Sequence, residues 1–198
     1  MKSLITSILL LLLTLQMAIA QNDKQYLLDY YASTETQLQK SIAGLSQDQM
    51  KFKATPESWS ISQCLEHIVL TEKMIFDMVK AGIALPANIT EMGKPVNTDE
   101  QIIAMVTDRS SKHKAPAELQ PEGKYISPET AMEDLKAGRV EILALINNTF
   151  DASLRDHVSE SPAGIVDVYQ NFLFIAGHTA RHTLQVQEVK VDPAFPKS

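Results

Sequence analysis

Residues 172–185 read Phe-Leu-Phe-Ile-Ala-Gly-His-Thr-Ala-Arg-His-Thr-Leu-Gln, an apolar run that passes directly into a segment with two histidines. Apolar residues here recur at helical spacing, which predicts a helix over about residues 166–189. A run of this kind is expected to lie deep in a helical core, where a histidine without a partner is costly. The position of His178 and His182 at its end therefore bears on function.

His178 and His182 are four residues apart, so their rings lie on one face of the helix, about one turn from each other. Such a pair is a natural two-ligand clamp for a transition metal. His67, in an earlier predicted helix, supplies a third imidazole if the two helices are neighbours. Three protein ligands leave one coordination position open, which is the pattern of catalytic rather than structural metal sites.

The spacing of the pair also fits a plainer interpretation, a polar helix face or two packed side chains. Position 179 is Thr, so the H-E-x-x-H arrangement of zinc proteases, with its adjacent general base, is absent. The sequence therefore predicts a metal site and leaves its catalytic residues unknown.

Working outward, three more segments show helical spacing. The first covers residues 23–42 and stops at Gly44. The second starts at Ser60, which can form a capping box with Gln63, and runs to about Lys80, before Gly82. The third follows Ser127-Pro128-Glu129, a cap residue, a proline and a first-turn acid, and ends near Asn148. The apolar positions expected in the core of these three helices are Leu27, Leu28, Tyr31, Leu38, Ile42, Leu65, Ile68, Val69, Met74, Leu135, Val140, Leu143 and Ile146.

Four long amphipathic helices predict an all-α four-helix bundle over residues 21–192. The connection between its second and third helices is long and contains a short helix capped by Asn97 or Thr98. A connection of this length can cross the bundle instead of forming a tight hairpin, so the helices need not follow the up-down-up-down order. Residues 161–164 are expected to be a connector, and the tail, residues 193–198, is expected to fray.

Residues 1–20 have the layout of a secretory signal peptide. Lys2 is followed by an apolar run over residues 4–15, and Ala18-Ile19-Ala20 offers a small-x-small cleavage site before Gln21. An uncleaved anchor is the alternative, but the run is short for a spanning helix, which needs about 20 apolar residues. We therefore expect an exported protein, periplasmic or secreted, with no stable membrane insertion after cleavage.

The net charge argues against nucleic acid as a partner, and the cysteine content argues against an internal disulfide. The chain has 18 Lys and Arg against 24 Asp and Glu, and removing Lys2 with the leader leaves 17 basic residues and a net charge of −7. An acidic chain without a basic cluster is a poor binder of nucleic acid. Its single cysteine, Cys64, cannot form an internal disulfide and is expected to be buried and inert rather than reactive.

Three blocks of the chain resemble one known family. Residues 56–67, Pro-Glu-Ser-Trp-Ser-Ile-Ser-Gln-Cys-Leu-Glu-His, open with Trp-Ser and place a histidine seven residues after that Ser. Residues 161–164, Ser-Pro-Ala-Gly, precede the H-x-x-x-H-x-x-Q block that ends at Gln185. Residues 123–135 fit the usual entry to a third helix. Together these blocks resemble the DinB/YfiT-like superfamily over nearly all of the chain after the leader.

The resemblance implies a helical bundle with a three-histidine metal site on His67, His178 and His182, holding zinc, nickel, iron or manganese. Some relatives are thiol-dependent transferases or isomerases, others are described as metal-dependent hydrolases, and many have no established reaction. For this chain a small-molecule substrate of unknown identity is expected. Low-molecular-weight thiols are mainly cytosolic, so the predicted export weakens the thiol-transferase interpretation.

The surroundings of the three histidines leave several roles open. Gln185 faces the same side as the pair and either supports a ligand or a metal-bound water, or is a plain interface residue. Cys64, one turn before His67, is a candidate extra ligand, with core packing favoured. Trp59 is expected to pack between helices, and Glu66 and Arg181 to face solvent or form surface pairs. A metal-dependent enzyme, a metal- or ligand-binding module without turnover and a plain interaction domain, as a homodimer or alone, are all consistent with the sequence.

Overall fold

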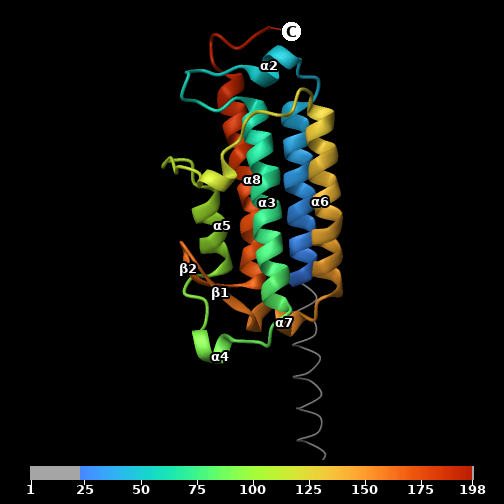
Figure 1. Cartoon of the computed structure of the whole chain (residues 1–198), viewed down its shortest axis with the longest axis vertical. Coiled ribbons are helices and arrows are strands. Elements are labelled where there is room, and N and C mark those ends of the chain that lie inside the picture. The colour runs from blue at the N-terminus through green and yellow to red at the C-terminus, as the bar shows by residue number, and fades with distance from the viewer. Residues whose placement is uncertain (1–22, 198) are drawn as a thin grey trace, which may run out of the picture.

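The computed structural model describes residues 23–197 (Figure 1). The predicted signal peptide, residues 1–20, lies outside the described residues, and export stays a prediction. No helix within residues 23–197 is long and apolar enough to cross a membrane.

Four long helices lie side by side along the molecule. They are the N-terminal helix (residues 23–42), α3 (Ile61–Ile83), α6 (Pro128–Asn148) and α8 (Val168–Lys190). The N-terminal helix and α8 run in one direction, whereas α3 and α6 both run in the opposite direction (Figure 1). The predicted all-α four-helix bundle is confirmed, and its order is not up-down-up-down.

The crossover between α3 and α6 makes this parallel arrangement possible. It contains α4 (Ile89–Met92), then α5 (Asp99–Thr107), which returns along α8, and a turn of 3₁₀ helix, η1 (Ala117–Leu119). Because α5 brings the chain back along the bundle, α6 starts from the same end as α3. The crossover thereby passes beside the face of α3 that carries His67.

The helix ends predicted from the sequence are present. Ser60 accepts from the backbone N–H of Gln63, whose side chain accepts from the N–H of Ser60, closing the capping box of α3. Thr98 caps α5 in the same way, and Ser127 caps α6 ahead of its proline. Gly44 follows the N-terminal helix with φ at 72°, a left-handed conformation that glycine adopts without strain.

Short helices and strands that the sequence analysis did not predict lie between the long helices. Two are helices, α2 (Gln47–Lys51) and α7 (Asp151–Asp156). The others are β1 (Val158–Ser161) and β2 (Gly164–Asp167), an antiparallel hairpin with Val158 opposite Asp167. The expected connector at residues 161–164 is the turn of this hairpin, and the last helix starts at Val168, capped by Asp167. Strands of four residues are too short for their alternation to show in the sequence.

The tail is not frayed over its described residues. The Phe195 ring packs edge-on against Phe52, with 5.4 Å between ring centroids. The side-chain amide of Gln49 donates to the carbonyl of Pro196 at 2.9 Å. The tail therefore covers the α2 end of the bundle.

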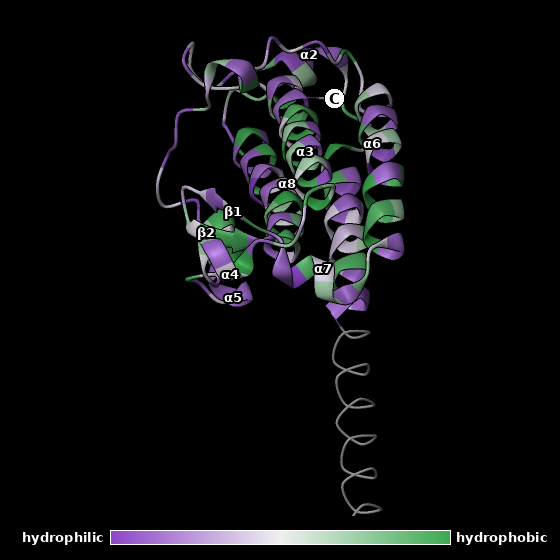
Figure 2. Ribbon diagram, turned by 60° about the horizontal axis from the view of Figure 1, so that its bottom comes forward, coloured by the Kyte–Doolittle hydropathy of each residue, from purple (hydrophilic) through white to green (hydrophobic). Residues whose placement is uncertain are grey.

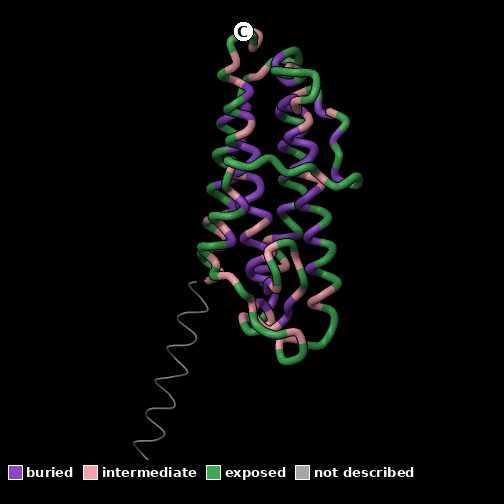
Figure 3. Tube along the Cα trace, turned by 90° about the vertical axis from the view of Figure 1, so that its left-hand side faces the viewer, coloured by how far each residue is buried: buried purple, intermediate pink, exposed green. Residues whose placement is uncertain are grey.

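Each long helix carries both hydrophilic and hydrophobic residues (Figure 2), and its buried residues lie on the sides facing the other helices (Figure 3). The buried stripe of α6 runs through Leu135, Arg139, Ile142 and Ile146. Val140, which we expected in the core, is 68% exposed. The reason is that the inward position is taken by Arg139, so its apolar neighbour points outward.

Arg139 is the centre of a buried polar network that joins all four long helices. Its Nη2 donates to Glu72 Oε1 at 2.7 Å and to Thr179 Oγ1 at 3.0 Å, and its Nη1 donates to the Tyr31 carbonyl at 2.9 Å. Thr179 donates to the same Glu72 oxygen at 2.7 Å. This network ties α6 to α3 and α8 next to His178.

Gly177 sets how closely α5 approaches α8. A Cβ added at this position would lie 2.4 Å from Val106 Cγ1 and 3.3 Å from the Tyr30 hydroxyl. We expect Gly177→Ala to lower the free energy of unfolding by about 1–3 kcal/mol, because the stiff Val106 side chain must be displaced. Chemical denaturation measures the change.

Gly138 provides the matched control, since it also lies inside a long helix but nothing is within 4 Å of a Cβ added there. Gly138→Ala should stabilise the protein by about 0.5–1 kcal/mol through helix propensity alone. Combining Gly177→Ala with Val106→Ala should recover part of the loss. Equal changes in stability for Gly177→Ala and Gly138→Ala would contradict a contact between Gly177 and Val106.

Candidate metal centre

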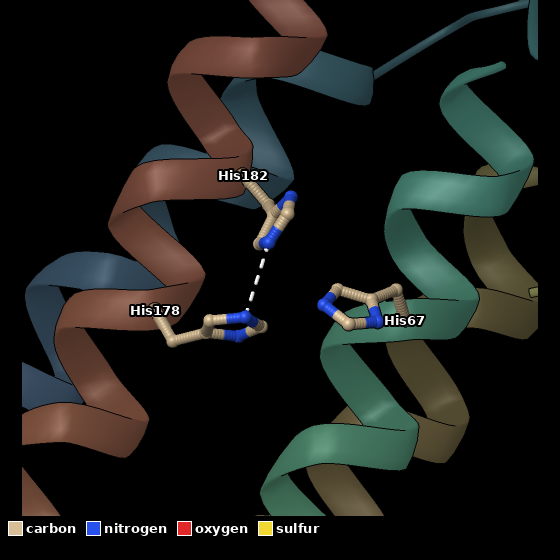
Figure 4. Close-up of side chains that lie close together, drawn as sticks. All are labelled: His67, His178 and His182. Atoms are coloured by element: carbon tan, nitrogen blue, oxygen red, sulfur yellow. Dashed lines mark hydrogen bonds between the residues drawn. The ribbon is translucent and has the colours of Figure 1, made fainter. Parts of the chain in front are cut away.

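The three predicted ligands meet between two neighbouring antiparallel helices. His67 projects from α3 and His178 and His182 from α8, and their rings point toward one another (Figure 4). One nitrogen from each ring lies within 4.8 Å of the other two, and all three residues are buried. His178 Nε2 and His182 Nε2 are 3.1 Å apart. The fold therefore brings together all three residues that the sequence analysis selected.

Hydrogen bonds on the far side of two rings fix which nitrogen faces the cluster. His67 Nδ1 lies 2.8 Å from the carbonyl oxygen of Leu119, in η1 of the crossover. His182 Nδ1 lies 2.8 Å from Gln185 Oε1. Both partners are acceptors, so each Nδ1 carries the proton and each Nε2 keeps its lone pair, that of His182 facing His178 Nε2. His178 Nδ1 is buried without a hydrogen-bond partner.

Burial keeps the three rings uncharged. Desolvation lowers the pKa of His67, and it lowers the pKa of His182 to about 3, with the nearby His67 acting in the same direction. Desolvation, followed by the proximity of His182 and His67, holds the pKa of His178 well below its usual range. Neutral imidazoles are the form that binds a metal ion.

Aromatic rings wall the cluster. Trp59 lies against His67, with 4.7 Å between ring centroids, and is stacked on His182 at 6.0 Å. Phe174 is stacked on His178 at 5.9 Å. Trp59, which we expected only to pack between helices, is thus a wall of the site as well. Its place one residue before the α3 cap puts it beside the second turn of the helix, where His67 lies.

The two carboxylates nearest to His67 in the sequence are both engaged. Glu66, expected to face solvent, is buried, and its Oε2 accepts from the backbone N–H groups of residues 122, 123 and 124 at 2.9, 2.6 and 3.1 Å. Glu72 accepts from Arg139 and Thr179. Glu66 therefore fastens the crossover to α3, and neither carboxylate is free to act as a base.

Cys64 is not among the residues whose ligand atoms converge within residues 23–197. It is fully buried in an apolar cluster with Leu65, Ile68 and Val186. Burial raises the pKa of its thiol to about 12, so a thiolate is strongly disfavoured. Core packing, the favoured prediction for this residue, describes its surroundings.

For two arginines near the site the sequence analysis was wrong or silent. Arg181, expected at the surface, is buried and donates to the backbone carbonyls of Asp108 and Ser111. Arg109 donates to Gln185 at 3.3 Å. Both contacts join α8 to the crossover, so no local pattern in either segment reveals them.

The residues present fit a divalent metal ion. Three neutral imidazole nitrogens suit zinc, nickel or iron, and no carboxylate or thiolate joins the cluster within the described chain. Two of the rings already have the outer hydrogen bonds that orient metal-bound histidines.

Comparison with known proteins places the chain in a family. The model of the DinB superfamily matches residues 30–186. The YuaE protein of Bacillus subtilis (strain 168) is 28% identical over 153 residues, covering 75% of this chain and 88% of YuaE. The structure of YfiT from Bacillus subtilis, described as a probable metal-dependent hydrolase with an unusual four-helix bundle topology, superposes with a TM-score of 0.58 at 14% identity and covers 84% of this chain and 85% of YfiT. The chain, with its three-histidine cluster between α3 and α8, belongs to the DinB superfamily.

Proposed function

We propose that this protein is a metal-dependent enzyme of the hydrolase type that holds one divalent cation on His67, His178 and His182. The observation that carries the proposal is the convergence of three buried imidazole nitrogens within 4.8 Å. The description of YfiT as a probable metal-dependent hydrolase supports the same class of reaction.

The residues of the site prepare it for this chemistry. His67 and His182 present Nε2 lone pairs, because their Nδ1 protons are held by Leu119 and Gln185. Trp59 packs against the His67 ring and Phe174 against the His178 ring, so apolar surface flanks the cluster. A divalent cation on three neutral nitrogens supplies Lewis acidity and an open coordination position, with which metallohydrolases activate water or polarise a carbonyl group.

A metal-binding module without turnover is the second candidate. It is favoured by the engagement of Glu66 with three backbone N–H groups and of Glu72 with Arg139. Hydrolases with an HExxH helix use a free glutamate beside the metal as general base. If neither glutamate is released, catalysis must proceed without a base from this part of α3.

Elemental analysis of the purified protein, prepared without a histidine tag and offered zinc, nickel, iron and manganese in turn, is the first test. We expect about one metal ion per chain for the wild type and almost none for His178→Ala/His182→Ala, because one remaining imidazole is not a stable site. His113→Ala is the matched control, since His113 is exposed on the crossover and outside the cluster. It should retain the full metal content.

The metal-loaded protein is then assayed on a panel of carboxylic esters, amides and phosphate esters, before and after chelation. Hydrolysis that disappears with the chelator and returns with the metal supports the enzyme. Metal binding without turnover of any of these substrates supports the module. A wild type that binds none of the four metals would eliminate both candidates.

A further inference from the structure

Arg109, on the crossover just after α5, is fixed between two residues of α8. Its Nη1 donates to Gln185 Oε1 at 3.3 Å, and its Nε donates to Glu188 Oε1 at 3.1 Å. Its Nη2 also bonds to Glu188 Oε2. Gln185 and Glu188 are three residues apart and so lie on neighbouring turns of one helix face. The guanidinium therefore contacts the side chain that in turn contacts His182.

The chemistry of these groups decides where the proton of His182 sits. A guanidinium has only donors, so the atom of Gln185 that faces Arg109 must be the amide oxygen. The same oxygen lies 2.8 Å from His182 Nδ1. Since an amide oxygen only accepts, Nδ1 must carry the proton, and Nε2 keeps the lone pair that faces the cluster.

The tautomer of His67 is set without a neighbouring side chain. Its Nδ1 partner is the backbone carbonyl of Leu119, which can only accept a hydrogen bond. The partner of His182 is a side-chain amide, which can rotate by 180° and offer its NH₂ group instead. In that orientation Nδ1 would accept, and the proton would sit on Nε2. Something must therefore hold the amide oxygen of Gln185 toward the ring.

We propose that Arg109 is a positioning residue that, through Gln185, holds His182 in the tautomer whose Nε2 can bind a metal ion. The inference rests on the proposed function only in taking Nε2 as the ligand atom. The hydrogen bonds of Arg109 go to Gln185 and Glu188 and not to the three rings. Its ion pair with Glu188 is part-exposed, at 20% and 56% of the two side chains, so it contributes little to folding, and its removal should act locally.

The test is the tautomer of His182 in the metal-free protein, measured by long-range ¹H–¹⁵N NMR of the imidazole rings. The wild type should show the Nδ1–H form. In Arg109→Met, the ratio of the Nδ1–H to the Nε2–H form should fall about tenfold, the effect of one net hydrogen bond. An unchanged ratio in Arg109→Met would overturn the proposal.

Two further variants separate the hydrogen bond from charge. Arg109→Met/Gln185→Glu should restore the Nδ1–H form, because an ionised carboxylate only accepts; failure to restore it counts against the proposal. Arg181→Met removes a guanidinium from α8 that bonds to the Asp108 and Ser111 carbonyls and not to Gln185. It should leave the ratio unchanged, and an equal shift in both single variants would assign the effect to charge instead. Since the tautomer is read without metal, metal content of the wild type decides the proposed function separately.

Discussion

Replacing Arg139 with Met should lower the free energy of unfolding by about 3–5 kcal/mol, because the variant leaves the Glu72 carboxylate buried without its cation. Arg139 is 2% exposed and Glu72 4% exposed. The two side chains share bonds of 2.7 and 3.3 Å, and Arg139 also donates to the Tyr31 carbonyl and to Thr179. Urea denaturation followed by circular dichroism measures the loss.

The double variant Glu72→Leu/Arg139→Met tests the cause. A buried ion pair replaced by apolar groups of similar volume is often neutral or stabilising, so the double variant should be clearly more stable than Arg139→Met. Lys136→Met is the matched control on the same helix, because Lys136 is half-exposed and 3.9 Å from Glu35. It should change stability by less than about 1 kcal/mol. A loss in Arg139→Met no larger than that of Lys136→Met would refute a buried, paired Arg139.

Acidification from pH 7.5 to pH 5 should lower the free energy of unfolding of the metal-free protein by about 2 kcal/mol through His182 alone. The pKa of His182 is lowered by burial from 6.5 to about 3. Between these two values the unfolded chain binds a proton that the folded chain does not. Stability is therefore unaffected by this group above pH 6.5, falls as the pH drops below it, and levels off near pH 3. The pKa values of His67 and His178 are lowered too, which adds to the loss.

Denaturation curves at several pH values, with a chelator present, measure this slope. Other groups also titrate over the range, so the comparison is with His182→Asn. Near pH 5, the slope of the free energy of unfolding against pH should be smaller in that variant than in the wild type by about 1.4 kcal/mol per pH unit, which is the effect of one proton. Identical slopes for the two proteins would show that His182 is not kept neutral by burial.

Much of the fold follows from signals that are local in the sequence. The capping box at Ser60 and Gln63, the Ser127-Pro128 start and the stop at Gly44 each lie within a few residues of the helix end they define. The ligand set could be chosen for a similar reason. A helix repeat places His178 and His182 on one face whatever the rest of the chain does.

Other features depend on partners far away in the sequence and could not be predicted. Glu66 is buried because the backbone of residues 122–124 surrounds its carboxylate. Arg139 takes a core position because Glu72, 67 residues earlier, neutralises it. A charged residue at a core position breaks the apolar periodicity of α6. For this reason its apolar neighbour Val140 was predicted to lie in the core instead.

The sequence by itself determined the four long helices, the capped helix starts and the His178 and His182 pair, because helical periodicity and capping act over one or two turns. His67 joined the pair only through the resemblance to a known family, since it lies on another helix. Only the tertiary structure decided that α3 and α6 run parallel, since that depends on α5 returning along α8. It likewise decided which nitrogen of His67 and of His182 carries the proton. Those choices are made by Leu119 and by Arg109 through Gln185, and the crossover residues reach their rings only when the whole bundle is assembled.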